Sequence, residues 1–271
     1  MFYYNSLVYE KDTIKKIANH ISYGYNNDYK ILFELNDCGK NKKISIICIP
    51  YAGGVGTAYQ NLACEISSLN DRIALYSIAL PGYDISYEET CGNFIQKIAI
   101  ECVKEITNNI STPIIVYGNC AGSALALEIS KLIQQTEGEL VCVILGAAIL
   151  ISRTSNIIQF INPWKYISDK RIYKIMKNLG AFSEDVSSET LNIIIKKFRR
   201  DTDIAFKYFT EIYNKHDQVK LNVPIYNIIG NVDSFTKKYK KDSIIGDCFL
   251  TQLNLLKLKM AGIILLLISH L

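Results

Sequence analysis

The chain has 271 residues, of which 49% are hydrophobic and 21% are charged, and its formal net charge is +4 at pH 7. This composition excludes a disordered chain and is ample for the core of one large globular domain. The main basic cluster, at 237–241, has the pattern of a solvated face. No phosphate-cradling glycine motif and no interleaved aromatic and basic pattern is present, so we expect no nucleic-acid partner.

The eight cysteines are scattered and form no C-x-x-C pair. Zinc and thioredoxin-type chemistry are therefore not expected, and we predict no metal site. The first residues lack the charged and apolar regions of a signal peptide, which predicts a reduced, cytoplasmic protein. The apolar stretch 260–269 is too short to span a bilayer, so we interpret it as a buried strand or helix, with a tail anchor as the alternative.

From residue 44 onward, strand-like and helix-like segments alternate. The expected strands are 44–49, 73–80, 113–118 and 140–145, and the expected helices are 58–69, 94–106 and 120 to about 135. Continuous apolar runs are typical of strands buried on both faces, and the alternation predicts an α/β fold with a mostly parallel sheet and helices on both faces. Residues 1–43 are polar and tyrosine-rich, have no clear place in this sheet, and are treated as an N-terminal extension.

The alternation breaks between about 151 and 220, in a helical, more polar stretch rich in aromatic residues, and a strand pattern resumes at 223–230. A helical insertion between two central strands is where hydrolases of this architecture carry a lid. The alternative is an ordinary helical subdomain in which the aromatic residues form core. We therefore predict one α/β domain over 44–271 that includes a helical lid at about 151–220.

The most informative motif is G-N-C-A-G at 118–122, which lies between an expected strand and an expected helix. It matches the nucleophile elbow G-x-S-x-G with Cys120 in place of serine. Small neighbours let the strand and helix approach closely, and a helix N-terminus favours a thiolate. The alternative is a buried structural cysteine in a strand-to-helix loop.

Two further features fit one reaction centre. The loop at 52–54 follows the first core strand, so the amides of Ala52 and Ala121 are predicted to form an oxyanion hole. Asp233 follows the strand at 223–230, and nucleophile, acid, histidine is the α/β-hydrolase chain order. A turn or helix-cap aspartate is the alternative for Asp233.

At this point the chain resembles a known family. The run I-P-Y-A-G-G at 49–54, followed by A-Y-Q-N-L-A at 58–63, L-P-G at 80–82 and F-R-R-D at 198–201, is similar to type II thioesterases over about 44–235. The resemblance implies an α/β-hydrolase fold and hydrolysis of acyl or peptidyl thioesters. The substrates would be carried on the phosphopantetheine arm of carrier proteins of nonribosomal peptide and polyketide synthases, and the enzyme would need no cofactor of its own.

The chain departs from the family pattern in three places. The family elbow reads G-H-S-M-G, whereas here the nucleophile is a cysteine. The stretch 145–150 carries no carboxylate, which leaves Asp233 as the acid, as in the type II arrangement. The terminal glycine-glycine-histidine-aromatic motif is missing, and G-D-C-F-L at 246–250 resembles it with cysteine in place of histidine.

The chain has three histidines. His20 lies in the extension and His216 precedes the strand that leads to Asp233, so we predict His270, the penultimate residue, as the base. The last thirty or so residues diverge from the family, and a truncation or a frameshift would account for this. Without a base a thiolate can still be acylated, but deacylation by water is slow.

The leading hypothesis is a carrier-protein thioesterase in which Cys120 attacks, His270 exchanges protons, Asp233 orients it, and Ala52 and Ala121 bind the oxyanion. A second hypothesis is another cysteine α/β hydrolase, such as a dienelactone-hydrolase-like enzyme, or an acyltransferase. A third is a catalytically impaired homologue that docks carrier proteins.

Overall fold

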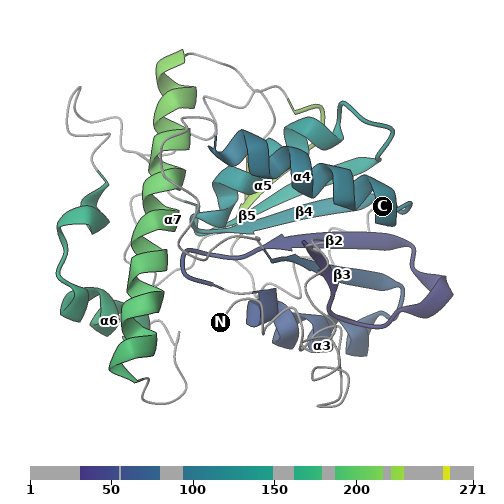
Figure 1. Ribbon diagram of the computed structural model, residues 1–271. Helices are drawn as coiled ribbons and strands as arrows, with labels where there is room; N and C mark the ends of the chain where they lie inside the picture. Colours follow the sequence, from purple (N-terminus) through teal and green to yellow (C-terminus); the bar gives the residue numbers. More distant parts are fainter. Residues whose placement is uncertain are drawn as a thin grey trace, which may run out of the picture.

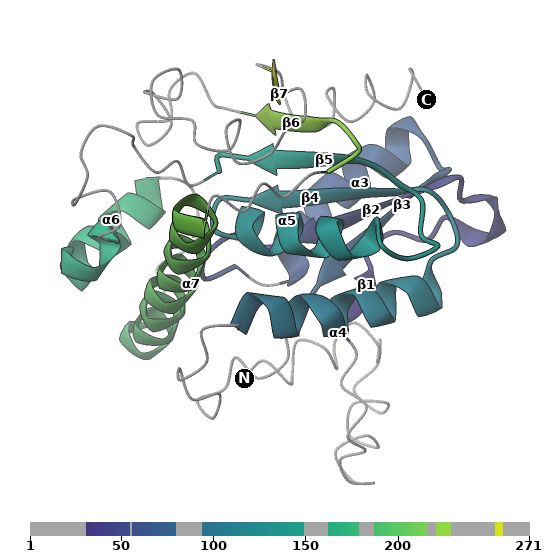
Figure 2. The same cartoon turned by 90° about the horizontal axis from the view of Figure 1, so that it is seen from above.

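The computed structural model describes residues 31–54, 56–79, 94–148, 162–178, 187–215, 221–228 and 253–256. Within these residues, seven strands form one sheet in the order β1-β3-β2-β4-β5-β6-β7, seen edge to edge in Figure 2. The strands are β1 (Leu32–Glu34), β2 (Ile44–Ile49), β3 (Ile73–Ile78), β4 (Ile114–Asn119), β5 (Leu140–Gly146), β6 (Ile225–Ile228) and β7 (Leu253–Leu256).

The sheet is mostly parallel, as the sequence predicts. Strands β2 to β7 pair in parallel, and β1 alone among the described strands runs antiparallel, against β3. Every residue of β2 and of β3 is buried. This explains why both strands read as continuous apolar runs, since each contributes side chains to two packed faces.

Helices cover both faces of the sheet (Figures 1 and 2). Helices α4 (Phe94–Asn109) and α5 (Gly122–Ile133) lie on one face, and α3 (Gln60–Leu69) lies on the other. Alternate residues of β2 enter the two cores: Ile47 packs on the α4 and α5 side, and Ile46 packs on the α3 side. The chain therefore has the α/β-hydrolase layers predicted from the alternation of its segments.

The beginning of α5 differs from the prediction. The helix starts at Gly122 rather than at residue 120. Cys120 has a φ of +52°, which lies in the left-handed region and cannot belong to a right-handed helix. The two residues before Gly122 instead form the turn that joins β4 to the helix.

The interpretation of 1–43 as lying outside the sheet was wrong for residues 32–34. These residues form the edge strand β1, paired with β3. The carboxylate of Glu105 on α4 accepts hydrogen bonds from the backbone amides of Ile31 and Leu32. A three-residue strand is too short to show a period of two, so the sequence offered no signal for it.

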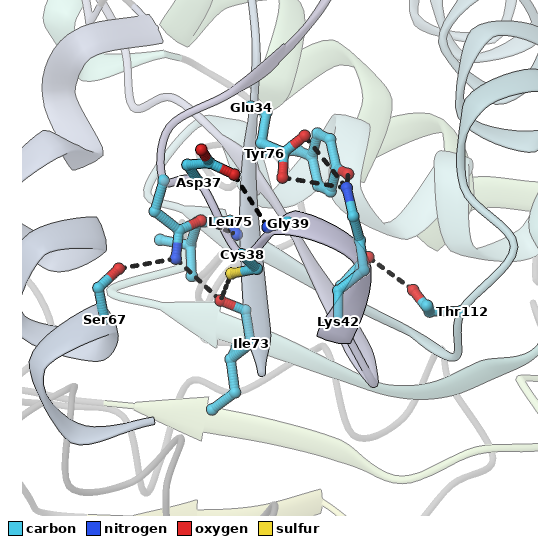
Figure 3. Close-up of polar contacts among 12 residues, drawn as sticks. Glu34, Asp37, Cys38, Gly39, Lys42, Ser67, Ile73, Leu75, Tyr76 and Thr112 are labelled. Carbon is cyan, nitrogen blue, oxygen red and sulfur yellow. Dashed lines mark hydrogen bonds and ion pairs between the residues drawn. The ribbon is translucent and has the colours of Figure 1, made fainter. Parts of the chain in front are cut away.

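Side-chain hydrogen bonds stabilise the edge of the sheet at β1 and the segment that follows it (Figure 3). Lys42 donates to Glu34 at 3.0 Å and to the hydroxyl of Tyr76 at 2.8 Å. The Cys38 thiol donates to the carbonyl of Ile73 at 3.0 Å. These contacts tie the segment 34–42 to β3.

The region expected to be a lid contains η4 (Pro163–Tyr166), α6 (Asp169–Asn178) and the long helix α7 (Ser188–Lys215). Arg199 of α7 donates to the carbonyls of Trp164 and Ile167 and pairs with Asp169, which holds η4 and the start of α6 against α7. Figures 1 and 2 show α7 beside the ends of the strands, with α6 on its outer side. Among the aromatic residues described here, Phe198, Phe206, Tyr208 and Phe209 are buried core residues, whereas Tyr166 is 74% exposed.

A buried polar contact joins α7 to α5. The hydroxyl of Tyr208 donates to Glu128, whose side chain is buried, at 3.0 Å. Replacing Tyr208 by phenylalanine leaves that carboxylate oxygen without this donor, and we expect a loss of about 1–2 kcal/mol of unfolding free energy. Chemical denaturation measures it, with the exposed Tyr166→Phe as the matched control. Equal midpoints for the two variants would contradict a stabilising role for the contact.

Candidate active site

Cys120 lies at the sharp turn between β4 and α5. Its φ of +52° is uncommon for a residue with a Cβ, and its amide donates to the carbonyl of Gly146 at 2.7 Å. Non-glycine residues adopt this strained conformation only where the surroundings enforce it, and such positions cluster at functional sites. The backbone therefore has the form of the predicted nucleophile elbow.

The glycines on either side of Cys120 have little room for a side chain. A Cβ on Gly118 would lie 2.5 Å from the Cβ of Ala126 and 2.8 Å from the carbonyl oxygen of Gly122. A Cβ on Gly122 would lie 2.4 Å from the carbonyl oxygen of Pro50. The sequence argument that small residues are needed for the close approach of strand and helix is thus confirmed by the packing.

Exposure separates Cys120 from most other thiols. Among the described cysteines, Cys120 is half-buried and Cys64 is exposed, whereas Cys38, Cys48, Cys102 and Cys142 are buried. Burial raises the pKa of the Cys142 thiol to about 12 and raises the pKa of the other three buried thiols. Since the thiolate is the nucleophile, these four thiols are unsuited to catalysis.

The loop after β2 begins beside the elbow, because Ile49 at the end of β2 pairs with Gly118 of β4. The amide of Gly54 donates to the carbonyl of Tyr51 at 2.8 Å, and Gly53 has a φ of +74°. This is the pattern of a type II turn, which needs a positive φ at its third residue and so favours glycine there. Ala52, the second residue of the turn, is buried.

The amides of Ala52 and Ala121 belong to two segments that lie side by side at the elbow. A Cβ on Gly122, the residue after Ala121, would lie 2.4 Å from the carbonyl oxygen of Pro50, two residues before Ala52, so the two segments lie close together. Within the described part of the chain, neither amide donates a backbone hydrogen bond. Their role with an oxyanion remains a prediction, and it requires two such donors aimed at one point.

Tyr59, which the sequence analysis did not identify as a site residue, contacts the end of β2. The hydroxyl of Tyr59 donates to the carbonyl of Ile49 at 2.8 Å, and its ring meets that of Tyr117 edge to face. Burial, with smaller contributions that include Cys120, raises the pKa of Tyr59 well above its usual value. Tyr59 therefore remains a neutral donor and holds the end of β2.

Helix α7 also reaches the loop, which the sequence analysis did not predict. Asp201 accepts a hydrogen bond from the amide of Gly53, and Lys197 donates to the carbonyl of Gly54, each at 2.8 Å. Burial lowers the pKa of Lys197 to about 8, Asp201 opposes this change, and Arg200 adds to it. An amine donates hydrogen bonds in both protonation states, so this contact does not require the charge.

The other predicted catalytic residues, Asp233 and His270, lie outside the described residues, as do His20 and His216. Strand β6 ends at Ile228 and runs parallel to β5, which runs parallel to β4. The carboxyl end of β6 therefore lies at the same edge of the sheet as Cys120. The roles of Asp233 as acid and His270 as base stay predictions.

The described segments contain no cluster of three or more histidine, cysteine or acidic side chains that could hold a metal ion. None of the helices described is both long enough and apolar enough to cross a bilayer.

Comparison with known proteins agrees with this geometry. Residues 45–148, which run from β2 through the elbow to the end of β5, match the family model of the thioesterase domain. Over these residues the chain is similar to a thioesterase domain. Thioesterases are hydrolases, and the matched residues include the elbow with Cys120. No curated protein matches the sequence.

Solved structures of thioesterases share the fold of this chain over most of its length. The type II thioesterase BorB from the borrelidin biosynthetic cluster is 18% identical with a TM-score of 0.59, covering 90% of this chain and 99% of BorB. YbtT, the type II thioesterase of the yersiniabactin NRPS/PKS pathway, is 17% identical with a TM-score of 0.56. The match covers 89% of this chain and 95% of YbtT. RedJ, a thioesterase from the prodiginine pathway of Streptomyces coelicolor, is 15% identical with a TM-score of 0.57. The match covers 84% of this chain and 89% of RedJ. At these identities the likeness shows the fold alone, and it agrees with the predicted α/β-hydrolase fold.

Proposed function

We propose that this protein is a type II thioesterase that removes acyl or peptidyl groups from carrier proteins, with Cys120 as its nucleophile. The observation that carries the proposal is a thiol on a strained elbow, within the residues that match the thioesterase domain. The thiol is neither deeply buried nor tied into a disulfide. These are the features required of an activated nucleophile beside an oxyanion hole.

The reaction begins with attack of the Cys120 thiolate on the carbonyl carbon of the substrate thioester. A new C–S bond forms while the carbonyl oxygen becomes an oxyanion, which the amides of Ala52 and Ala121 stabilise. Collapse of this intermediate breaks the bond to the pantetheine sulfur, and that sulfur leaves as a thiolate that takes up a proton. The product of the first step is an acyl group on Cys120.

The second step returns the enzyme to its starting state. Water attacks the acyl-Cys120 thioester, the carboxylic acid leaves, and the thiol is regenerated. Activation of water requires a base, which we assign to His270 oriented by Asp233. Because the first step exchanges one thioester for another and can use a thiolate already formed, acyl capture depends on the base less than deacylation does.

The structural neighbours support the substrate class, since YbtT belongs to an NRPS/PKS pathway and BorB to a biosynthetic cluster. We therefore propose an acyl or peptidyl carrier protein as the partner. The mechanism uses no cofactor of the enzyme's own, because the phosphopantetheine arm belongs to the substrate. The cytoplasmic location expected from the sequence stays a prediction.

Two other functions remain as alternatives. A dienelactone-hydrolase-like enzyme or an acyltransferase would use the same elbow with an oxygen ester, a lactone or an acceptor other than water. A carrier-protein-binding homologue without catalysis would bind the partner but form no acyl enzyme. The match of 45–148 to the thioesterase domain favours thioester chemistry over both.

A substrate panel tests the proposal. The full chain is incubated with an acyl pantetheine thioester, the matching oxygen ester and a lactone, and release of free thiol, alcohol and acid is followed. We expect the thioester to react at least about 10-fold faster than the oxygen ester, because a thiolate is the better leaving group. Preference for the oxygen ester or lactone, or reaction only with an added acceptor, would favour the second alternative, and no reaction would favour the third.

A further inference from the structure

One stripe of helix α7 faces the loop that precedes the elbow. Ile194, Lys197, Phe198 and Asp201 have the spacing i, i+3, i+4 and i+7, which places them on a single helix face. A Cβ built on Gly53 would lie 3.5 Å from the carbonyl oxygen of Ile194 and 3.5 Å from the Cβ of Phe198. The helix therefore lies directly against Gly53.

Two polar side chains on the same stripe bond to neighbouring loop residues. The carboxylate of Asp201 accepts from the amide of Gly53, and the amine of Lys197 donates to the carbonyl of Gly54, both at 2.8 Å. One bond uses a donor of the loop and the other an acceptor, so together they restrain both the position and the rotation of the chain at 53–54. The loop is separated from these side chains by more than 140 residues of sequence.

These two bonds restrain the turn 51–54, which contains the amide of Ala52 that is predicted to bind the oxyanion. The amide of Gly53 donates to Asp201 and the amide of Gly54 donates to the carbonyl of Tyr51, whereas the amide of Ala52 donates no backbone hydrogen bond to a described residue. Peptide planes are rigid. The bond from Asp201 holds the plane between Ala52 and Gly53, and the bond from Lys197 holds the plane that follows Gly54, so together they limit how far the amide of Ala52, one residue before Gly53, can turn. A donor misplaced by about 1 Å can cost on the order of 100-fold in rate.

We propose that Asp201 and Lys197 of α7 are positioning residues, which hold the loop 51–54 so that the amide of Ala52 is aimed at the carbonyl oxygen of a thioester on Cys120. The role of Ala52 rests on the proposed function. Helix α7, which lies in the region expected to form a lid or an ordinary helical subdomain, thus also assembles part of the reaction centre, and movement of α7 away from the loop would release the oxyanion donor.

The test uses variants of the full chain with matched controls on the same helix. Asp201→Ala removes the acceptor, Asp201→Asn keeps an amide oxygen in its place, and Lys197→Met removes the donor while keeping the stem. Asp203→Ala is the control for the carboxylate, because Asp203 pairs with Lys207 at 2.8 Å instead of with the loop. Lys196→Met, at an exposed position, is the control for the amine.

Three measurements are compared. Amide hydrogen exchange of the peptide that contains 51–54 reports the loop directly and needs no activity. The rate of acylation of Cys120 by an acyl pantetheine thioester reports the oxyanion hole. The rate of alkylation of Cys120 by iodoacetamide reports thiol reactivity without an oxyanion.

We expect Asp201→Ala and Lys197→Met to speed exchange of the loop by at least about 10-fold and to slow acylation by about 10- to 100-fold, with alkylation within about 2-fold of wild type. Asp201→Asn should retain most of the acylation rate, and both controls should match wild type. Loop exchange in Asp201→Ala and Lys197→Met equal to that in the controls would overturn the proposal, as would equal slowing of acylation and alkylation. If Asp201→Ala does not fold, the other two variants test the proposal. Lys197→Met must then show faster loop exchange and slower acylation, and Asp201→Asn must retain most of the acylation rate.

Failure of the proposed function gives a different result. In that case wild-type protein is not acylated by the thioester, while the exchange comparison still shows whether Asp201 and Lys197 hold the loop.

Discussion

Replacement of Cys120 by serine is expected to abolish reaction with thioesters nearly as completely as replacement by alanine, with a loss of at least about 1,000-fold for both. A thiol has a pKa near 8.5 and supplies thiolate without help, whereas a serine hydroxyl must be deprotonated by a base during attack. The family motif that carries this base is missing from the chain. Initial rates of thiol release from an acyl pantetheine substrate measure the loss.

Cys64→Ser is the matched control, because Cys64 is an exposed thiol on α3, on the far side of the sheet from α5. It should keep the wild-type rate. If Cys120→Ser retained a tenth or more of that rate, a working base would lie beside residue 120. The view that the thiol acts with little help from a base would then be wrong, and the assignment of His270 would gain support.

Replacement of Gly122 by alanine is expected to destabilise the protein by about 3 kcal/mol, because the new Cβ would meet two backbone atoms that cannot rotate away. It would lie 2.4 Å from the carbonyl oxygen of Pro50 and 2.8 Å from that of Ile49. Helix α5 must then move away from β2, which also separates the amide of Ala121 from the loop at Ala52. Thermal unfolding should show a fall in Tm of about 6–12 °C.

Gly138→Ala provides the comparison for this prediction. Gly138 lies after α5, and a Cβ there would lie 3.2 Å from its nearest neighbour, the side-chain oxygen of Thr136. We expect a change of about 1 kcal/mol or less, since a flexible side chain can give way. A Tm for Gly122→Ala equal to that of Gly138→Ala would contradict the close approach of α5 to β2.

The layered fold was predictable because its signals are local. The apolar runs at 44–49 and 73–78 identify strands buried on both faces, and the small residues at 118 and 122 identify the close turn between strand and helix. β1 was missed because three residues show no periodicity. β7 was missed as well, since its four residues, Leu253–Leu256, offer equally little pattern.

The contacts of the site were less predictable than its turn. The bonds from Asp201 and Lys197 to the loop join segments far apart in sequence, and either residue alone is an ordinary charged position on an amphipathic helix. Only their shared stripe with Ile194 and Phe198 hinted that this face of α7 meets the chain. Asp233 and His270 lie outside the described residues, so their catalytic roles rest on chain order.

Mass spectrometry of the acyl enzyme tests the central claim most directly. The full chain, in a Cys64→Ala background that removes the exposed thiol of α3, is mixed with an acyl pantetheine thioester, quenched in acid and digested. The account predicts one acyl group per chain, located on Cys120, which forms faster than it is hydrolysed and is absent from Cys120→Ala. A chain that carries no acyl group on Cys120 and releases no thiol from the substrate would contradict the account.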